Sequence, residues 1–312
     1  MFVRTRRLAL VIASLVTGAA GAAAQTSGAS PLLVAPAELA RELGDPDLVV
    51  LHIGPREDYA SGHIAGSRLV DLRDVSTPRR EGALALELPD DATLRQGLQR
   101  LGISDRSRVV VAFGDDWVSP ATRVVFTLQA VGLGASTRFL DGGTAAWRRA
   151  GLPVTREVPA PAAVGRLTTV ADRGLIVDYG WVQASGRAPG VRLIDARAPM
   201  FYEGPGMADH GAGHIPGAVN VPFNSLFDDS LRVLPVEELR RRFAAAGVKP
   251  GDTIAAYCHI GQQATVVLFA ARLLGHPVRL YDGSMDDWEK RGLPLDNPTR
   301  EGRDGSPPEG GR

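Results

Sequence analysis

The chain contains the same order of sequence features twice, and this repeat limits the folds that it can adopt. Each half has an apolar stretch, a His-Ile-x-Gly segment, a second apolar stretch, a helical pattern and an Asp-Gly-x-x-x-x-Trp run. These features extend from Leu48 to Trp147 and again from Val191 to Trp288, and each tryptophan follows its aspartate by six positions. A repeated unit of this size in a chain of 312 residues predicts two similar domains.

The apolar stretches are short and rich in β-branched residues, which is typical of strands buried on both faces of a parallel sheet. Helical patterns alternate with them, so we expect an α/β fold in which each domain is a small parallel sheet flanked by helices. The predicted boundaries are a signal peptide over 1–24, a first domain over 31–156, a linker over 157–164, a second domain over 165–296 and a disordered tail over 297–312.

The N-terminus has the pattern of a cleavable export signal. Arg4, Arg6 and Arg7 precede an apolar run over 8–16, and three alanines stand before Gln25. The run is too short to span a membrane, so we expect a periplasmic or secreted protein without a membrane anchor after cleavage. The pattern leaves the general secretion route and the twin-arginine route both open.

Cys258 is the only cysteine, so it cannot form an internal disulfide, and its position favours a chemical role. It lies between a strand-like and a helix-like stretch, where unpaired backbone N–H groups of the loop and the first helical turn stabilise anions. Gly261 permits the positive φ that a curled loop requires. We therefore expect a nucleophilic thiolate in the loop His259, Ile260, Gly261, Gln262 and Gln263.

Two alternatives to this interpretation of Cys258 are a buried apolar cysteine and a cysteine-dependent phosphatase. Such phosphatases need an arginine after five intervening residues, because a guanidinium clamps the phosphoryl oxygens. That position is Ala264, and the next arginine is Arg272, well along the helix. The formal net charge of zero also gives no reason to expect nucleic acid as a partner.

The chain resembles the tandem-domain rhodaneses, which include thiosulfate and 3-mercaptopyruvate sulfurtransferases. The resemblance rests on both His-Ile-x-Gly segments, on Asp195-Ala196-Arg197, on the Tyr257-Cys258 loop and on both Asp-Gly-x-x-x-x-Trp runs. It implies a catalytic cysteine in the second domain only, and Gly114-Asp115-Asp116 stands at the corresponding turn of the first.

The resemblance also implies a chemistry. Cys258 attacks the sulfur of a small-molecule donor and carries it as a persulfide until a thiophilic acceptor such as cyanide or a thiol removes it. No metal or organic cofactor is needed. His259 and Ile260 match neither donor class, and Arg73 stands where mercaptopyruvate enzymes have an acidic residue, so we expect thiosulfate to be the better donor.

Other family positions have alternative interpretations. Arg197 either helps hold an anionic donor or forms a structural ion pair with Asp195 or Glu203. His63 and His214 are expected to satisfy backbone groups, and both repeat tryptophans are expected to pack in the core.

A second class of function stays open from sequence. The chain could be a sulfur carrier or an interaction module on the same fold, without multiple turnover. The insertion over 204–212 is a candidate contact for a partner or a flap over the site. A monomer is the favoured oligomeric state.

Overall fold

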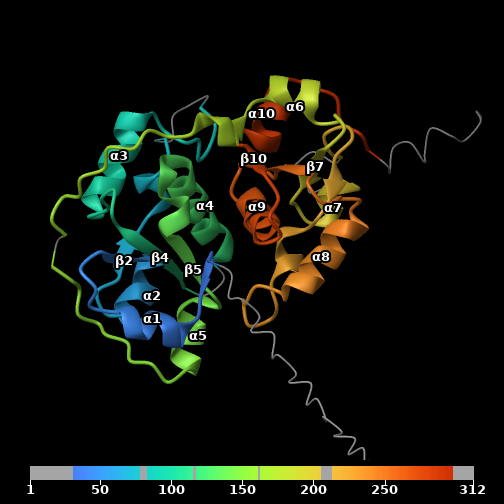
Figure 1. Cartoon of the computed structure of the whole chain (residues 1–312). Helices are drawn as coiled ribbons and strands as arrows, with labels where there is room; N and C mark the ends of the chain where they lie inside the picture. The colour runs from blue at the N-terminus through green and yellow to red at the C-terminus, as the bar shows by residue number, and fades with distance from the viewer. Residues whose placement is uncertain (1–30, 78–82, 115–116, 161, 205–212, 298–312) are drawn as a thin grey trace, which may run out of the picture.

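The computed structural model describes residues 31–77, 83–114, 117–160, 162–204 and 213–297. It has two α/β lobes, each built on one five-stranded parallel sheet, which confirms the predicted fold class (Figure 1). The predicted signal peptide lies outside the described residues, as do nearly all of the tail and of the 204–212 insertion.

The two sheets have the same topology. The first has the order β1-β5-β4-β2-β3, and the second has the equivalent order β6-β10-β9-β7-β8. The strands are β1 (Leu33–Val34), β2 (Leu48–Ile53), β3 (Arg68–Val70), β4 (Arg108–Phe113), β5 (Thr137–Leu140), β6 (Ile176–Val177), β7 (Val191–Asp195), β8 (Val219–Asn220), β9 (Thr253–Tyr257) and β10 (Val278–Tyr281).

Helices connect the strands and cover both faces of each sheet. The α-helices are α1 (Pro36–Glu42), α2 (Arg56–Ser61), α3 (Asp91–Arg100), α4 (Val118–Leu128), α5 (Gly143–Arg149), α6 (Tyr179–Ser185), α7 (Pro199–Tyr202), α8 (Val236–Ala245), α9 (Ala264–Leu273) and α10 (Ser284–Lys290). Short 3₁₀ or π turns are η1 (Leu72–Asp74), η2 (Gln129–Leu133), η3 (Gly134–Ser136), η4 (Arg173–Leu175) and η5 (Phe223–Leu226). In the described part of the chain, no helix is long and apolar enough to cross a membrane.

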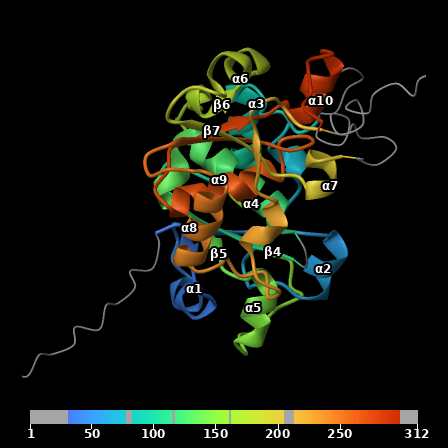
Figure 2. The same ribbon diagram turned by 90° about the vertical axis from the view of Figure 1, so that its right-hand side faces the viewer.

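One hydrophobic core is shared between the two lobes. Successive strand residues point to opposite faces, so Val49 and Leu51 join this shared core while Val50 packs on the other face of the first sheet. Helices α4 and α9 lie side by side between the sheets (Figures 1 and 2). At their contact the buried hydroxyls of Thr122 and Thr265 hydrogen-bond at 2.9 Å.

Each lobe also extends a segment to the other in an equivalent way. The carboxylate of Asp282 accepts the backbone N–H of Leu88 at 2.9 Å, and the carboxylate of Asp141 accepts that of Val233 at 2.9 Å. Two residues before these donors, Leu86 and Leu231 have φ values of 59° and 58°, a region that non-glycine residues rarely adopt. The repeat found in the sequence therefore extends to the contacts between the lobes.

The repeated histidines and tryptophans are framework residues, as predicted. The Nδ1 atoms of His63 and His214 lie 2.7 Å and 2.9 Å from the backbone carbonyls of Tyr59 and Tyr202, whose rings stack on the imidazoles. Both repeat tryptophans are buried, and their indole Nε1 groups donate to proline carbonyls six residues later, in the pairs Trp147–Pro153 and Trp288–Pro294.

The segment that connects the two sheets continues to contact the first lobe after the prolines of the predicted linker. The N–H of Gly165 donates to Gln99, that of Thr168 to the Asp105 carboxylate, and that of Asp172 to Ala130. These bonds position the segment that leads into η4. The domain limits drawn from sequence stay a prediction.

The shared core leads to a stability prediction. We expect residues 164–298 expressed alone to melt more than about 10 °C below the full chain, or to self-associate, because α9 loses its packing against α4. Calorimetry with a measurement of molecular mass tests this, with the separately expressed 31–163 fragment added back as the control. A monomeric fragment that melts with the full chain would contradict the shared core.

Candidate active site

Cys258 follows the last residue of β9, at the carboxyl edge of the second sheet. Its side chain lies on the same face as Ile254 and Ala256, in the core shared with the first lobe. The residue is a free cysteine and is only 1% exposed. A buried thiolate is costly unless hydrogen-bond donors surround it, so the loop that follows must supply them.

The backbone carbonyls of this loop are bonded to groups outside it. The carbonyls of Cys258 and His259 accept the N–H groups of Met285 and Asp286, at 3.1 Å and 3.0 Å, from the first turn of α10. The Gly261 carbonyl accepts Arg123 Nη1 at 3.1 Å, from α4 of the first lobe. Both lobes therefore hold the loop by its carbonyl groups.

In the described structure, the N–H groups of residues 260–264 are left available. In a trans peptide, a carbonyl and the N–H of the next residue point in opposite directions. The outward carbonyls therefore turn the following N–H groups toward the inside of the loop. In the described structure, no protein acceptor bonds the N–H groups of residues 260–264. Unpaired N–H groups in series are able to form an anion-binding concavity, so this loop stays a candidate anion site.

Gly261 is required at the tightest point of the loop. Its φ is +78°, and a Cβ there would lie 2.6 Å from the Asp282 carbonyl oxygen and 3.2 Å from Arg123 Nη1. A side chain would therefore push the loop away from both lobes.

We expect Gly261→Ala to slow alkylation of Cys258 by iodoacetamide about tenfold and to destabilise the fold by roughly 1–3 kcal/mol. Gly275→Ala is the matched control, because Gly275 has a φ of +84° but no atom within 4 Å of an added Cβ. It should share the backbone strain without the loss of reactivity. Equal alkylation rates in the two folded variants would rule out a steric role for Gly261.

The other predicted loop residues are distributed around this concavity. The His259 ring lies edge-on to Phe201 at a centroid distance of 4.7 Å, and Ile260 is partly buried. Gln262 Nε2 donates to Ser119 Oγ of the first lobe at 3.0 Å, so its side chain anchors the loop. Gln263 Oε1 is buried without a protein partner in the described structure, which leaves it able to accept a hydrogen bond.

In the structure, Arg197 forms the ion pair with Asp195 that the sequence analysis gave as one of two alternatives. Its Nη2 lies 2.6 Å from Asp195 Oδ2 and also donates to the Gly213 carbonyl at 2.7 Å. Both side chains of the ion pair are at most 1% exposed. Burial acts to lower the pKa of Arg197, but the hydrogen bond and the charge of Asp195 act in the opposite direction, and the net result is a raised pKa. The geometry gives Arg197 a role in fixing the end of β7.

The strand register shows which residues of the first lobe occupy the positions equivalent to Cys258 and its neighbours. Phe139 of β5 pairs with Val111, and its counterpart Leu280 of β10 pairs with Ala256, so Val111 and Ala256 are equivalent positions. Two residues further along each strand, Phe113 is therefore the equivalent of Cys258. The same register aligns Gly54 with Arg197 and His52 with Asp195. The first lobe therefore lacks the thiol and also the ion pair beside it.

Sequence reasoning missed Arg123. Its guanidinium is fully buried, and besides the Gly261 carbonyl it contacts Asp282 Oδ1 at 2.6 Å and donates from Nη2 to the Leu86 carbonyl. The available signal was a single charged residue within the otherwise uncharged helix Val118–Leu128. Nothing in the sequence indicated that this charge reaches the loop of the other half.

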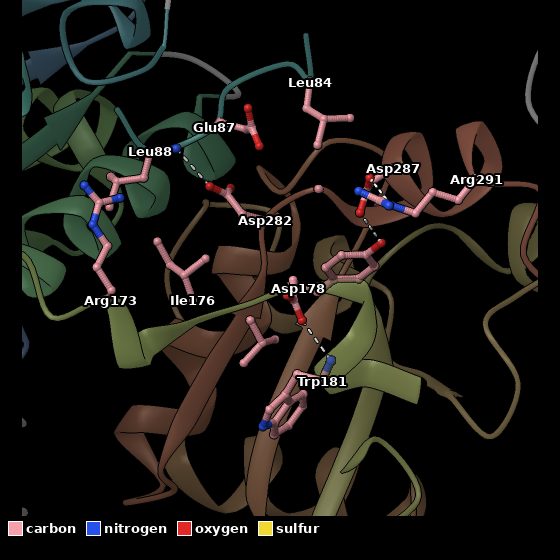
Figure 3. Close-up of a pocket in the computed structure, with 13 residues that line it drawn as sticks. Leu84, Glu87, Leu88, Arg173, Ile176, Asp178, Trp181, Asp282, Asp287 and Arg291 are labelled. Carbon is pink, nitrogen blue, oxygen red and sulfur yellow. Dashed lines mark hydrogen bonds and ion pairs between the residues drawn. The ribbon is translucent and has the colours of Figure 1, made fainter. Parts of the chain in front are cut away.

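A cavity of about 540 Å³ opens between the lobes beside the loop, at the carboxyl ends of β6 and β10 (Figure 3). Asp282 and Gly283 form the wall that it shares with the loop, and Cys258 does not line it. Burial raises the pKa of Glu87 in this cavity, and the carboxylates of Asp282, Asp287 and Asp286 raise it further. The arginines of the cavity are bound to carboxylates, in the pairs Arg173–Asp91 and Arg291–Asp287.

Among the residues that the structure describes, no three His, Cys, Asp or Glu side chains are grouped to hold a metal ion. The chemistry that the described groups support is attack by the Cys258 sulfur, with backbone N–H groups binding the resulting negative charge.

Comparison with known proteins gives consistent matches. The model of the rhodanese-like domain family matches residues 35–150 and 178–291. A probable 3-mercaptopyruvate sulfurtransferase of Pseudomonas aeruginosa is 37% identical over 273 residues, which is 83% of this chain and 95% of that protein. Rat thiosulfate sulfurtransferase is 34% identical over 249 residues, 77% of this chain and 81% of that protein. The crystal structure of a 3-mercaptopyruvate sulfotransferase from Escherichia coli superposes with a TM-score of 0.71 at 26% identity, covering 81% of this chain and 98% of that one.

Proposed function

Because the chain belongs to the rhodanese family and is a sulfurtransferase with two rhodanese-like domains, we propose that it moves a sulfane sulfur through a persulfide on Cys258. The donors are thiosulfate or 3-mercaptopyruvate, and the acceptor is a thiophile such as cyanide or a thiol. The observation that supports this proposal is a lone thiol at the start of a loop in which the carbonyls of Cys258, His259 and Gly261 are bonded to neighbouring helices, while the N–H groups of residues 260–264 have no protein acceptor in the described structure.

Each half-reaction needs only the thiol and these donors. The Cys258 thiolate attacks the outer sulfur of thiosulfate, the S–S bond of the donor breaks, and sulfite leaves with the bonding electron pair. The persulfide anion then lies within the loop, where N–H groups stabilise its charge. Cyanide attacks the outer sulfur, thiocyanate leaves, and the thiolate is regenerated.

We propose thiosulfate as the preferred donor. The concavity binds negative charge through backbone N–H groups, and thiosulfate carries two charges where 3-mercaptopyruvate carries one carboxylate. The family arginine Arg197 is occupied by Asp195, so it does not add a free cation for the carboxylate.

Initial rates with cyanide as acceptor test both the sulfur transfer through Cys258 and the preference for thiosulfate. We expect multiple turnovers with a higher kcat/KM for thiosulfate than for 3-mercaptopyruvate. A higher value for 3-mercaptopyruvate would reverse the donor assignment without affecting the persulfide. If the protein releases one sulfur per chain and then stops, the sulfur-carrier function would replace enzymatic turnover.

We also propose that this reaction takes place outside the cytoplasm. The arginines and the apolar run before Gln25 support a cleavable signal. N-terminal sequencing of the protein from a bacterial periplasmic fraction tests the proposal, and an intact Met1 in a cytoplasmic fraction would refute it.

A further inference from the structure

Arg123 makes a buried contact between the lobes that has no counterpart in the repeat. Asp282 corresponds to Asp141, and Leu86 corresponds to Leu231. Thr122 and Thr265 are bonded to one another, but the next residue is Arg123 in α4 and the buried apolar Val266 in α9. The arginine is therefore present only where it faces the lobe that carries the thiol.

Three bonds hold its guanidinium in one orientation. Nη1 contacts Asp282 Oδ1 at 2.6 Å and the Gly261 carbonyl at 3.1 Å, and Nη2 donates to the Leu86 carbonyl. Arg123 is 0% exposed and Asp282 is 5% exposed, so the pair is shielded from water. Charge-assisted bonds in such surroundings fix geometry closely.

The bond to Gly261 has a direct consequence for the active loop. A carbonyl held toward α4 turns the N–H of the next residue, Gln262, the opposite way, into the concavity. Gln262 itself is anchored to Ser119 of the same helix α4, at 3.0 Å. Both ends of this peptide unit are thus set by the first lobe.

We propose that Arg123 is a positioning residue: from the first lobe, it aims the Gln262 N–H at the sulfur anion carried by Cys258. This inference rests on the proposed function. It gives the first lobe a specific part in the reaction, because the second lobe alone lacks the donor that orients its own loop. The group acts through the backbone and does not touch the sulfur donor.

The test must separate positioning from folding, because removal of Arg123 alone leaves the Asp282 carboxylate buried and unpaired. The double variant Arg123→Met with Asp282→Asn removes that charge, and the side-chain amide oxygen that replaces the carboxylate still accepts the Leu88 N–H. Asp282→Asn alone shows the effect of the carboxylate. Asp141→Asn is the matched control, since it changes the equivalent carboxylate without contact to the Cys258 loop.

We expect the folded double variant to form persulfide from thiosulfate about 10- to 100-fold more slowly in single turnover, with a much smaller change in KM. Arg123→Lys should recover part of this rate, because an ammonium reaches the Gly261 carbonyl or Asp282 but not all three acceptors. Asp141→Asn should keep the wild-type rate.

A wild-type loading rate in the folded double variant would overturn the inference, as would a loss of rate that only follows melting temperature across the set. Alkylation of Cys258 by iodoacetamide distinguishes this failure from failure of the proposed function, because it needs no sulfur donor. If wild type does not accept sulfur, slower alkylation in the double variant still supports positioning, and unchanged alkylation refutes it.

Discussion

Replacement of Cys258 by serine is expected to lower steady-state transfer of sulfur from thiosulfate to cyanide by at least about 10³-fold. A serine hydroxyl is close in size to the thiol but is not ionised near neutral pH, so the nucleophile is lost while the packing is kept. Thiocyanate formation, followed by its coloured iron complex, measures the effect.

The control for this variant is its fold, because Cys258 is 1% exposed within the shared core. Its melting temperature should lie within a few degrees of wild type. Activity above one tenth of the wild-type rate in a folded Cys258→Ser protein would show that transfer proceeds without this residue.

The second large effect concerns stability in mild acid and arises from His52. This side chain is 1% exposed, and neither ring nitrogen has a partner in the described structure. Burial, assisted by the charges of His63 and Arg148, lowers the pKa of His52 from 6.5 to about 4. The native protein therefore holds His52 neutral while the unfolded chain protonates it.

The direction of the pH effect follows from this difference. Between pH 6.5 and about 4 the unfolded state binds a proton that the native state does not, so stability falls as pH falls through this range. Complete loss of the contribution corresponds to about 3 kcal/mol, since one pKa unit is worth about 1.4 kcal/mol. Denaturant unfolding at several pH values between 7.5 and 4.5 measures it.

His52→Leu removes the titrating group and should flatten this part of the pH profile. The quantity to compare is the change with pH within each protein, because the substitution also alters packing around Tyr59. His276→Gln is the control for loss of a buried or part-buried histidine in the other lobe, where the Nδ1 of His276 contacts the Asp252 carbonyl at 2.9 Å. A His52→Leu profile as steep as wild type would show that other groups cause the acid sensitivity.

Much of this molecule could be predicted from sequence because the relevant signals are local or repeated. The apolar strands, the His-Ile-x-Gly turns and the Cys258 loop each have their signal within a few neighbouring residues, and the strands and turns occur in both halves. The N–H groups of residues 260–264, which have no protein acceptor in the described structure, follow from a strand-to-helix turn around a glycine.

The parts that were missed depend on contacts between distant residues. Arg123 meets Asp282 across 159 positions of sequence, and no periodicity indicates such a pair. Arg197 shows the related difficulty that one residue type serves both anion binding and structural ion pairs, and its ion pair with Asp195 Oδ2 at 2.6 Å is seen only in the folded chain. His52 was part of an apolar strand pattern, and its lack of partners appears only in the packed core.

Persulfide transfer at Cys258 is tested by the intact mass of the protein and of Cys258→Ser after exposure to thiosulfate and, separately, to 3-mercaptopyruvate. Only the wild type is expected to gain the mass of one sulfur atom, and cyanide is expected to remove it. A wild-type protein that keeps an alkylatable thiol and gains no sulfur from either donor would contradict persulfide transfer at Cys258.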